Sequence, residues 1–485
     1  MIRRQSFYIV GLLLIILGFS MLFSVGCSLI YGDGDLIPLL QSIAVTITSG
    51  LILVIFFKSK DKKDLSTHDG FAVVTLGWIA IVIFSAFPFY FSGTLDYTNS
   101  FFEAMSGLTT TGATVLGHSD TLMIEELPHG ILFWRSFTQF IGGMGIIVFS
   151  IAILPMLGMG GVQLFRAEVA GPVADKITPR VKQTAKLLWG IYVGFVLILC
   201  LILKIEGMSW FDAICHSFTT IATSGFSTKN ISIAAYGGLI QWTIIIFMFL
   251  AATNFSLHYY FIAKGKFEYY KDHEFRVYFG LCIIFSILFF INIVGTNKYQ
   301  TDLLSFRHSV FAAVSILTTT GFSTENFNEW PEMSKMLLFF LFFIGGSAGS
   351  TTGGMKIIRS ILVVKYLLYE VRKLLHPKGV FNITIGENTI DDNVVRATLG
   401  FYLFYILIFV FTAIFLSFTG LDVETALTAS ASAIGNIGPG LGSIGPTDNW
   451  GHLSDFAKWL TSFCMLLGRL EIFTVVVLFS RSFWK

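Results

Sequence analysis

Four short turns recur along the chain, and their residue types could coordinate a monovalent cation. Each turn ends in glycine, three of them contain hydroxyl residues, and a serine or threonine precedes each glycine at the same distance. The turns are Thr109-Thr110-Thr111-Gly112, Ala222-Thr223-Ser224-Gly225, Thr318-Thr319-Thr320-Gly321 and Gly435-Asn436-Ile437-Gly438, and the preceding hydroxyl residues are Ser106, Thr219, Ser315 and Ser432. Because each turn falls between two apolar runs, we interpret the four as copies of one functional unit.

Backbone carbonyls are the groups in these turns best suited to bind a cation. Glycine permits dihedral angles that a side chain would forbid, so successive carbonyls can point inward at an ion. A short helix that stops halfway through a membrane also directs the negative end of its dipole there. Four such turns around one axis would replace the hydration shell of a monovalent cation, whereas we expect the threonine hydroxyls to bond to local backbone. The alternative is that these small residues only pack helices together.

A glycine-rich loop lies inside the apolar run 335–370 and could obstruct such a pore. Its small and polar residues include Gly345, Gly346, Gly349, Ser350, Thr351, Thr352, Gly353 and Gly354. Irregular backbone at membrane depth is tolerated only where it lines a cavity. We therefore predict a gate here rather than a cytoplasmic turn between two spans, because only about 11 apolar residues precede the loop and ~20 are needed to cross.

Two arginines fall within apolar runs, where a charge costs about 2.5–3.5 kcal/mol at mid-helix on insertion scales. Arg469 should face the interior, where it could bond the carbonyls of the glycine-rich loop and raise the electrostatic barrier to a departing cation, as part of the gate. A salt bridge with Glu471 is disfavoured because residues two apart on a helix do not face each other. For Arg135, snorkelling to the interface and a functional role are equally open.

Transmembrane helices are the elements that would position these groups. The chain has 485 residues, 54% hydrophobic and 13% charged, and a mean hydropathy of +0.75, which excludes a soluble globular protein. Apolar runs long enough to cross a ~30 Å hydrocarbon core predict an all-α polytopic membrane protein. These runs are 7–30, 38–57, 72–92, 130–156, 187–205, 239–263, 277–295, 335–370, 397–418 and 456–481. The first lacks a cleavage site, so we interpret it as a retained helix.

The distribution of charge predicts the orientation of the chain. An even number of crossings puts both termini on one side, and most of the 32 Lys and Arg residues fall on that side. Both termini are therefore predicted to be cytoplasmic. The external loops are acidic, so that face should concentrate cations. The net charge of +2 gives no support to nucleic-acid binding.

The other reactive residues do not form a recognisable enzyme centre. The five cysteines are scattered without a CxxC pair, and the nine histidines are dispersed without an HExxH motif. The chain also has no Walker sequence. We interpret the cysteines as buried structural thiols and His216 as a packing residue, and we expect no enzyme activity.

The repeats divide the chain into five segments. We expect two N-terminal transmembrane helices in 1–64, followed by four units of span, pore helix and span around a central ion pore. The units would occupy 65–180, 181–270, 271–380 and 381–485, and the third would contain the broken inner helix and the glycine-rich loop.

Several motifs, with the fourfold repeat, resemble the Trk/Ktr/HKT superfamily of potassium transporters. The turns 109–112 and 318–321 carry this resemblance, as do Gly142-Gly143-Met144-Gly145-Ile146, the segment 349–356 and Gly468-Arg469-Leu470-Glu471. The two extra N-terminal spans and the stretch 376–401 look similar to the bacterial TrkH branch. The resemblance covers essentially the whole chain.

The resemblance implies potassium uptake across the bacterial inner membrane by a homodimer with one pore per chain. It also implies gating by a TrkA-like cytosolic ring that binds ATP/ADP or NAD(H). Nucleotide sensitivity would then reside in this partner, and we expect no cofactor in this chain other than the potassium it carries. Plant relatives that carry sodium have serine in place of the first filter glycine, so Gly112 favours potassium. The fourth turn departs from the pattern, because it lacks hydroxyls and Pro439 follows it.

A sodium- or proton-coupled secondary transporter is the alternative function. Such a protein would need broken helices with a midplane substrate pocket and usually inverted repeats, whereas the four repeats here share one orientation. Passive flux and flux coupled to protons or sodium are both compatible with the sequence.

Overall fold

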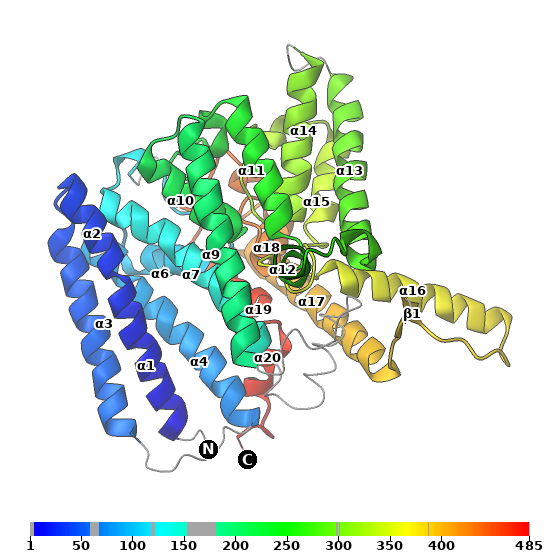
Figure 1. Ribbon diagram of the computed structural model, residues 1–485, viewed down its shortest axis with the longest axis horizontal. Helices are drawn as coiled ribbons and strands as arrows, with labels where there is room; N and C mark the ends of the chain where they lie inside the picture. Colours follow the sequence, from blue (N-terminus) through cyan, green and yellow to red (C-terminus); the bar gives the residue numbers. More distant parts are fainter. Residues whose placement is uncertain are drawn as a thin grey trace.

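The computed structural model describes residues 4–58, 67–117, 122–152, 181–296, 299, 301–386 and 388–484. Long helices dominate it, which confirms the predicted all-α membrane fold (Figure 1). In the described residues the strands are limited to the hairpin of β1 (Thr384–Ile385) and β2 (Asn388–Thr389). The first helix starts, and the last helix ends, at the same end of the molecule (Figure 1).

An N-terminal hairpin packs through glycines and caps a helix of the main bundle. It consists of α1 (Arg4–Ser20), α2 (Leu22–Tyr31) and α3 (Leu36–Phe57). Between α2 and α3, Asp33 accepts a 2.8 Å bond from the backbone N–H of His129, and Asp35 accepts one of 3.0 Å from that of Ile131. Both N–H groups belong to the first turn of a helix, which favours anions. The backbone and side-chain bonds from His129 hold the pKa of Asp33 below its usual value.

The rest of the chain repeats one arrangement of a long helix, a short helix and an inner helix. The long helices are α4 (Thr67–Ser85, extended by α5, Phe87–Phe91), α9 (Val181–Ile205), α13 (His273–Val294) and α17 (Asp392–Phe418). The short helices are α6 (Tyr97–Leu108), α10 (Trp210–Ile221), α14 (Asp302–Leu317) and α18 (Val423–Gly435). The inner helices are α7 (His129–Ala152), α11 (Gly238–Ala251) with α12 (Phe255–Lys264), α15 (Glu332–Leu341) with α16 (Ile357–Leu375), and α19 (Asp455–Arg469) with α20 (Phe473–Val476).

Short 3₁₀ helices complete the connections. They are η1 (Ile124–Glu126), η3 (Ser232–Ala235), η4 (Tyr269–Lys271), η5 (Phe327–Glu329), η6 (Gly442–Ile444) and η7 (Val477–Phe479).

The four short helices all start in the same way. At each N-cap an Asp, Ser or Thr side chain accepts a bond from the backbone N–H three residues later, which satisfies a donor that the helix leaves unpaired. The capping residues are Asp96, Ser209, Thr301 and Asp422. All four helices end directly before, or within, the glycine-containing turns.

Six helices are long and apolar enough to span a membrane in the described residues, or up to eight if two bent pairs each count as one span. The six match the predicted runs 7–30, 38–57, 72–92, 187–205, 277–295 and 397–418. Predicted run 130–156 corresponds to α7, and its last residues lie outside the described part of the chain.

Two of the predicted runs are bent pairs of helices, and each pair can still count as one span. Run 239–263 bends by 96° between α11 and α12, and run 456–481 bends by 109° between α19 and α20. At the first bend the side chain of Asn254 accepts a bond from Ser256 and so starts a new helix. At the second, Glu471 takes a left-handed φ of 55° that ends α19.

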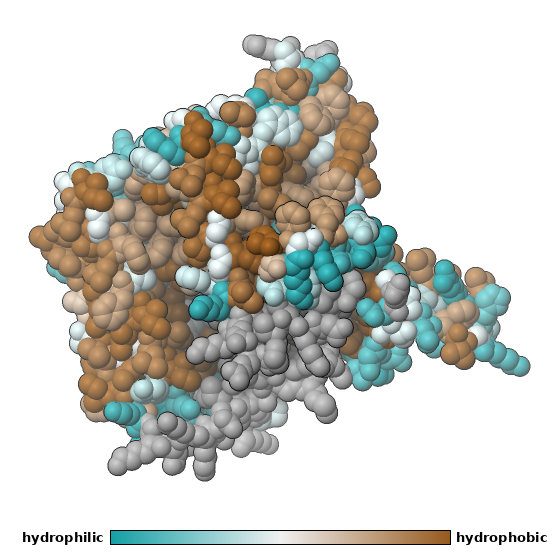
Figure 2. All heavy atoms as spheres, viewed as in Figure 1, coloured by the Kyte–Doolittle hydropathy of each residue, from teal (hydrophilic) through white to brown (hydrophobic). Residues whose placement is uncertain are grey.

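Run 335–370 is broken, as predicted, between α15 and α16. After α15 and the glycine-rich loop, α16 projects sideways from the bundle (Figure 1). Lipid-facing side chains cover much of the remaining surface, where hydrophobic residues dominate the visible face between hydrophilic groups near its ends (Figure 2). Strongly exposed examples include Ile16, Ile55, Leu201 and Ile291.

Helix packing in the N-terminal hairpin predicts the effect of one substitution. A Cβ on Gly50 would lie 2.8 Å from the carbonyl oxygen of Gly11 and 2.8 Å from Ile15 Cγ1. We expect Gly50→Ala to lower the unfolding free energy in detergent by about 1–3 kcal/mol, the usual cost of overpacking. Gly190→Ala on α9 is the control, because nothing lies within 4 Å of its Cβ position, and it should stabilise by up to about 1 kcal/mol. Equal melting temperatures for the two variants would contradict this packing argument.

Candidate functional site

The four glycine-containing turns share one backbone conformation. The second residue of each is left-handed, with φ of 53° at Thr110, 51° at Thr223, 54° at Thr319 and 54° at Asn436. The closing glycines are also left-handed, with φ of 81°, 81°, 78° and 106° at Gly112, Gly225, Gly321 and Gly438. In each turn, the N–H of the third residue donates to the carbonyl of the preceding hydroxyl residue, over 2.9–3.1 Å. Four segments of different sequence therefore adopt the same irregular path.

The turns close on one another as a ring, which we call the turn ring (residues 109–112, 222–225, 318–321 and 435–438). A Cβ on Gly112 would lie 2.0 Å from the carbonyl oxygen of Ser224, which is the third residue of the next turn. The same contact recurs from Gly225 to Thr320 (2.1 Å), from Gly321 to Ile437 (2.0 Å) and from Gly438 back to Thr111 (2.7 Å). No side chain fits at these positions, so the approach of neighbouring turns requires glycine.

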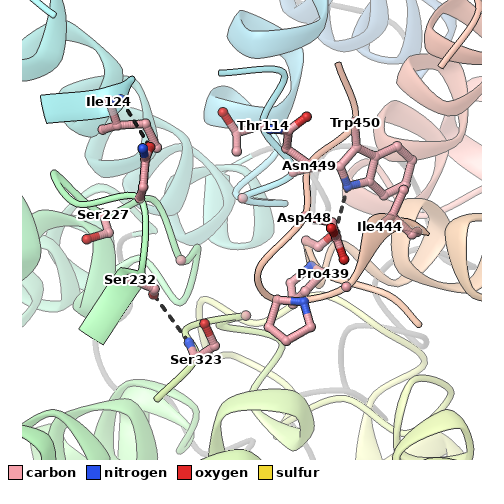
Figure 3. A pocket seen from close by; sticks show the side chains of 18 of the residues that line it. Thr114, Ile124, Ser227, Ser232, Ser323, Pro439, Ile444, Asp448, Asn449 and Trp450 are labelled. Atoms are coloured by element: carbon pink, nitrogen blue, oxygen red, sulfur yellow. Dashed lines mark hydrogen bonds between the residues drawn. The ribbon is translucent and has the colours of Figure 1, made fainter. Parts of the chain in front are cut away.

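All four glycines line one cavity of about 70 Å³ (Figure 3). Trp450 closes one side, with its indole N–H 3.2 Å from the Gly438 carbonyl, and Ser323 bonds to Ser232 on the other. Lys229 and Asp448 contribute charges of opposite sign to the lining. The turn ring thus opens into a small polar vestibule.

Most hydroxyl groups of the ring bond within the protein, as predicted. Thr109 Oγ1 donates to Met105 O over 2.7 Å and lies 2.8 Å from Thr111 Oγ1, and Thr318 is 2.7 Å from Thr320 in the same way. The fourth turn has no hydroxyl pair. Instead, Asn436 Nδ2 donates to Thr111 Oγ1 of the first turn over 3.0 Å. The side chains thus fix the turns and leave main-chain oxygens as the candidate ligands.

The glycine-rich loop bonds directly to the turn ring. Thr351 Oγ1 donates to Ile221 O over 3.0 Å and lies 3.1 Å from Thr223 Oγ1. The Gly353 N–H donates to Thr319 Oγ1 over 2.8 Å, and a Cβ on Gly353 would lie 2.4 Å from the Gly435 carbonyl oxygen. The loop therefore contacts the second, third and fourth turns.

Glu274 and contacts within the loop also hold the glycine-rich loop in place. The carboxylate of Glu274 accepts bonds from the N–H groups of Ala348 (2.8 Å) and Ile358 (3.1 Å). Within the loop, Ser350 lies 2.9 Å from Thr352, and a Cβ on Gly346 would meet Thr352 and Ala252. Left-handed φ values at Gly345, Gly349 and Gly354 give the loop its tight turns.

Arg469 bonds the loop as predicted from its position in the sequence. Its guanidinium donates to Thr351 O over 2.9 Å and to Gly142 O over 2.8 Å, and the side chain is buried. Glu471 pairs with Arg359 over 2.8 Å instead of with Arg469. An arginine charge thus lies beside the loop, next to the bend that ends α19.

Sequence reasoning missed a polar network behind the first two turns. Arg135 is 1% exposed, so it does not snorkel, and its Nε donates to Glu103 over 2.6 Å. Nη1 of Arg135 donates to Ser227 O over 2.8 Å, and the guanidinium lies 3.7 Å from the ring centre of Phe226. Gln139, one helical turn later on α7, bonds the second turn. The sequence signal that could have predicted this network was the pair Arg135 and Gln139, which lie four residues apart in an apolar helix.

The remaining reactive residues are structural in the described part of the chain. His216 is buried between the Asp212 carbonyl (2.8 Å) and the Ser227 hydroxyl (2.9 Å), as expected of a packing residue. All five cysteines are free. Among the described residues, no group of three or more His, Cys, Asp or Glu could hold a metal ion.

Comparison with known proteins gives full-length matches. A family model described as "TrkH: Cation transport protein" matches residues 39–485. The Trk system potassium uptake protein TrkH of Vibrio parahaemolyticus is 40% identical over 489 residues, covering 99% of each chain. TrkH of Escherichia coli K12 is 39% identical over 482 residues, covering 98% of each, and TrkG of the same strain is 37% identical over 88% of this chain and 87% of its own. The crystal structure of the potassium transporter TrkH from Vibrio parahaemolyticus superposes with a TM-score of 0.90 at 38% identity over 99% of both chains.

The buried pair of Glu103 and Arg135 predicts a large loss of stability when it is broken. Glu103→Ala leaves an uncompensated buried arginine, which costs about 3–5 kcal/mol. The control is Glu332→Ala, because Glu332 is 89% exposed and pairs with Lys335 at the surface, where an ion pair contributes about 0–1 kcal/mol. Thermal unfolding of the two purified variants in detergent tests the difference. Similar melting temperatures would mean that the buried pair does not hold the fold.

Proposed function

The chain belongs to the TrkH family of cation transport proteins, and we propose that it carries potassium into the cell through the turn ring. The proposal rests above all on the ring itself, in which four glycine-containing turns of equal conformation meet around one vestibule. The names of the full-length relatives support potassium uptake as the process. As a member of a transport family with at least six apolar spans, the protein is a multi-pass membrane protein and not of an enzyme class.

We propose that backbone carbonyls of the turn ring coordinate dehydrated potassium. The main-chain oxygens of its sixteen positions supply the ligands, while most of the hydroxyls already bond to protein groups. The bonds that cross-link the turns resist collapse onto a smaller ion. Rings of carbonyls select cations by cavity size and by the number and field strength of the ligands.

The glycine-rich loop and Arg469 form the proposed gate. The loop bonds the second and third turns and packs closely against the fourth, so an ion leaving the ring would meet it next. Arg469 adds a positive charge at the same level and bonds the loop through Thr351. Opening the path would require these bonds to exchange for others, a small rearrangement that a regulatory protein could drive.

A cytosolic partner is the proposed source of regulation. The words "Trk system" in the relatives' names describe a system of several components, which supports a TrkA-like regulatory ring. The GxGxxG match at residues 440–445 lies on a loop and the short helix η6, not between a strand and a helix as a dinucleotide site requires, so ATP/ADP or NAD(H) would bind to that partner. We place both termini in the cytoplasm and the protein in the bacterial inner membrane, on the basis of the Lys and Arg distribution.

The projecting helix α16 supports a homodimer. Along one side it exposes an apolar stripe at helical spacing, consisting of Val364, Leu367, Leu368, Val371, Leu374 and Leu375. Each of these side chains is more than half exposed. An amphipathic helix that leaves the bundle in this way is suited to packing against a second copy.

Rubidium flux tests the proposed function. Purified protein reconstituted into liposomes, with and without its cytosolic partner, should take up radioactive rubidium in competition with external potassium. The absence of flux under both conditions would overturn the proposal. The reversal potential under opposed potassium and proton gradients separates a passive pathway from the coupled alternative, because only coupling shifts it with the proton gradient.

Selectivity should depend on Gly112. A serine Cβ there would lie 2.0 Å from the Ser224 carbonyl and would need a left-handed φ of 81°. We expect Gly112→Ser to reduce rubidium flux, or the preference for rubidium over sodium, by about tenfold or more. Gly93→Ser is the matched control, because Gly93 has φ +70° with nothing near its Cβ position. Unchanged preference in Gly112→Ser at normal expression would remove Gly112 from the pathway.

Removal of the Arg469 charge should increase flux. At an effective dielectric of about 20 and a separation of about 8 Å, one unit charge repels a passing cation by about 2 kcal/mol, or more than tenfold in rate. We expect Arg469→Ala to raise rubidium flux per folded protein by about tenfold, and Arg469→Lys, which keeps the charge, to stay near the wild-type rate. Normal flux per folded molecule in Arg469→Ala would leave this arginine with a structural role alone.

A further inference from the structure

Gln139 makes an unusually complete set of bonds to the second turn of the ring. It lies on α7, is 0% exposed and uses both ends of its amide. Its Oε1 accepts from Ser224 Oγ (2.7 Å) and from the N–H of Phe226 (3.1 Å). Its Nε2 donates to the carbonyl oxygen of Ser224 over 2.9 Å.

The orientation of this amide is fixed by chemistry. A peptide N–H can only donate, so the partner of the Phe226 N–H must be the amide oxygen and not the amide nitrogen. The NH₂ group is thereby left facing the Ser224 carbonyl. Gln139 therefore donates to a ring carbonyl as a necessary consequence of accepting from Phe226.

This bond makes the ring asymmetric. The third-residue carbonyls of the four turns, those of Thr111, Ser224, Thr320 and Ile437, each lie against the glycine of a neighbouring turn. Within the described residues, the Ser224 carbonyl alone among these four accepts a hydrogen bond. One of four equivalent oxygens is thus shared with a protein donor and held in place.

We propose that Gln139 is a positioning residue that determines cation preference through the Ser224 carbonyl. This inference rests on the proposed conduction of potassium through the turn ring. A small cation such as sodium needs strong ligands that can approach closely, to compensate for its larger dehydration cost. A carbonyl that already accepts a bond offers a weaker field, and the bond prevents its movement toward a smaller ion. Gln139 therefore disfavours sodium relative to potassium.

The test compares two buried amides on corresponding inner helices. Gln139→Met keeps the length of the side chain but removes both kinds of bond. The control is Gln241→Met on α11, because Gln241 is also buried but donates to Tyr236 O (3.0 Å) and Ile233 O (3.4 Å), outside the ring. Rubidium and sodium fluxes are measured in the same proteoliposomes. Their ratio does not depend on the folded fraction, since both ions pass through the same molecules.

We expect Gln139→Met to lower the rubidium-to-sodium flux ratio by about fivefold and Gln241→Met to leave it unchanged. A wild-type ratio in a conducting Gln139→Met variant would overturn the inference while leaving the proposed function intact, and so would an equal fall in both variants. If Gln139→Met conducts neither ion, Gln139→Asn decides, because its shorter amide cannot hold both bonds and a wild-type ratio would again overturn the inference. Wild-type protein that conducts no rubidium would instead overturn the proposed function.

Discussion

The contact between each ring glycine and the carbonyl of the neighbouring turn is the constraint on which the rest of the structure depends. At 2.0–2.7 Å from a hypothetical Cβ, these contacts leave room for hydrogen alone, so the four turns meet more closely than side chains would permit. Such irregular backbone in a membrane needs every polar group satisfied or solvated, since each unsatisfied group costs several kcal/mol. The four capped short helices, the cross-linking hydroxyls and the buried amides all meet this requirement. The surrounding helices in turn keep lipid away from it.

The sequence predicted the parts of this arrangement that local chemistry determines. Four turns that end in glycine, three of them with hydroxyl residues, predicted one repeated form, and the structure brings the turns together. Their cation-binding role stays a prediction. The burial cost of Arg469 predicted an interior partner, and the bond to Thr351 confirms it. The glycines of 345–354 predicted a break in the inner helix, and the break is present.

Tertiary contacts determine the parts that could not be predicted. The bend after Ala251 has no glycine or proline to mark it, and it is stabilised by the bond from Ser347 to the Ala252 carbonyl across the bundle. The left-handed Glu471 that ends α19 pairs with Arg359, which is far away in sequence. Gln139 bonds the second turn, and Glu103 bonds Arg135 and the Val115 N–H, contacts that only the tertiary fold brings about. Hydropathy predicts that such segments are apolar, but it does not predict where they bend.

Asp33 and Asp35 of the N-terminal hairpin accept bonds from the first turn of α7 and so link the hairpin to the pore-lining helices. These aspartates precede residue 39, where the family match begins, yet they hold the start of the helix that carries Arg135, Gln139 and the carbonyl that Arg469 binds. The connection between α2 and α3 therefore anchors the start of a helix that lines the vestibule and bonds the turn ring. Two carboxylates in a connection between helices thus contribute to the placement of a helix whose other contacts lie deep in the bundle.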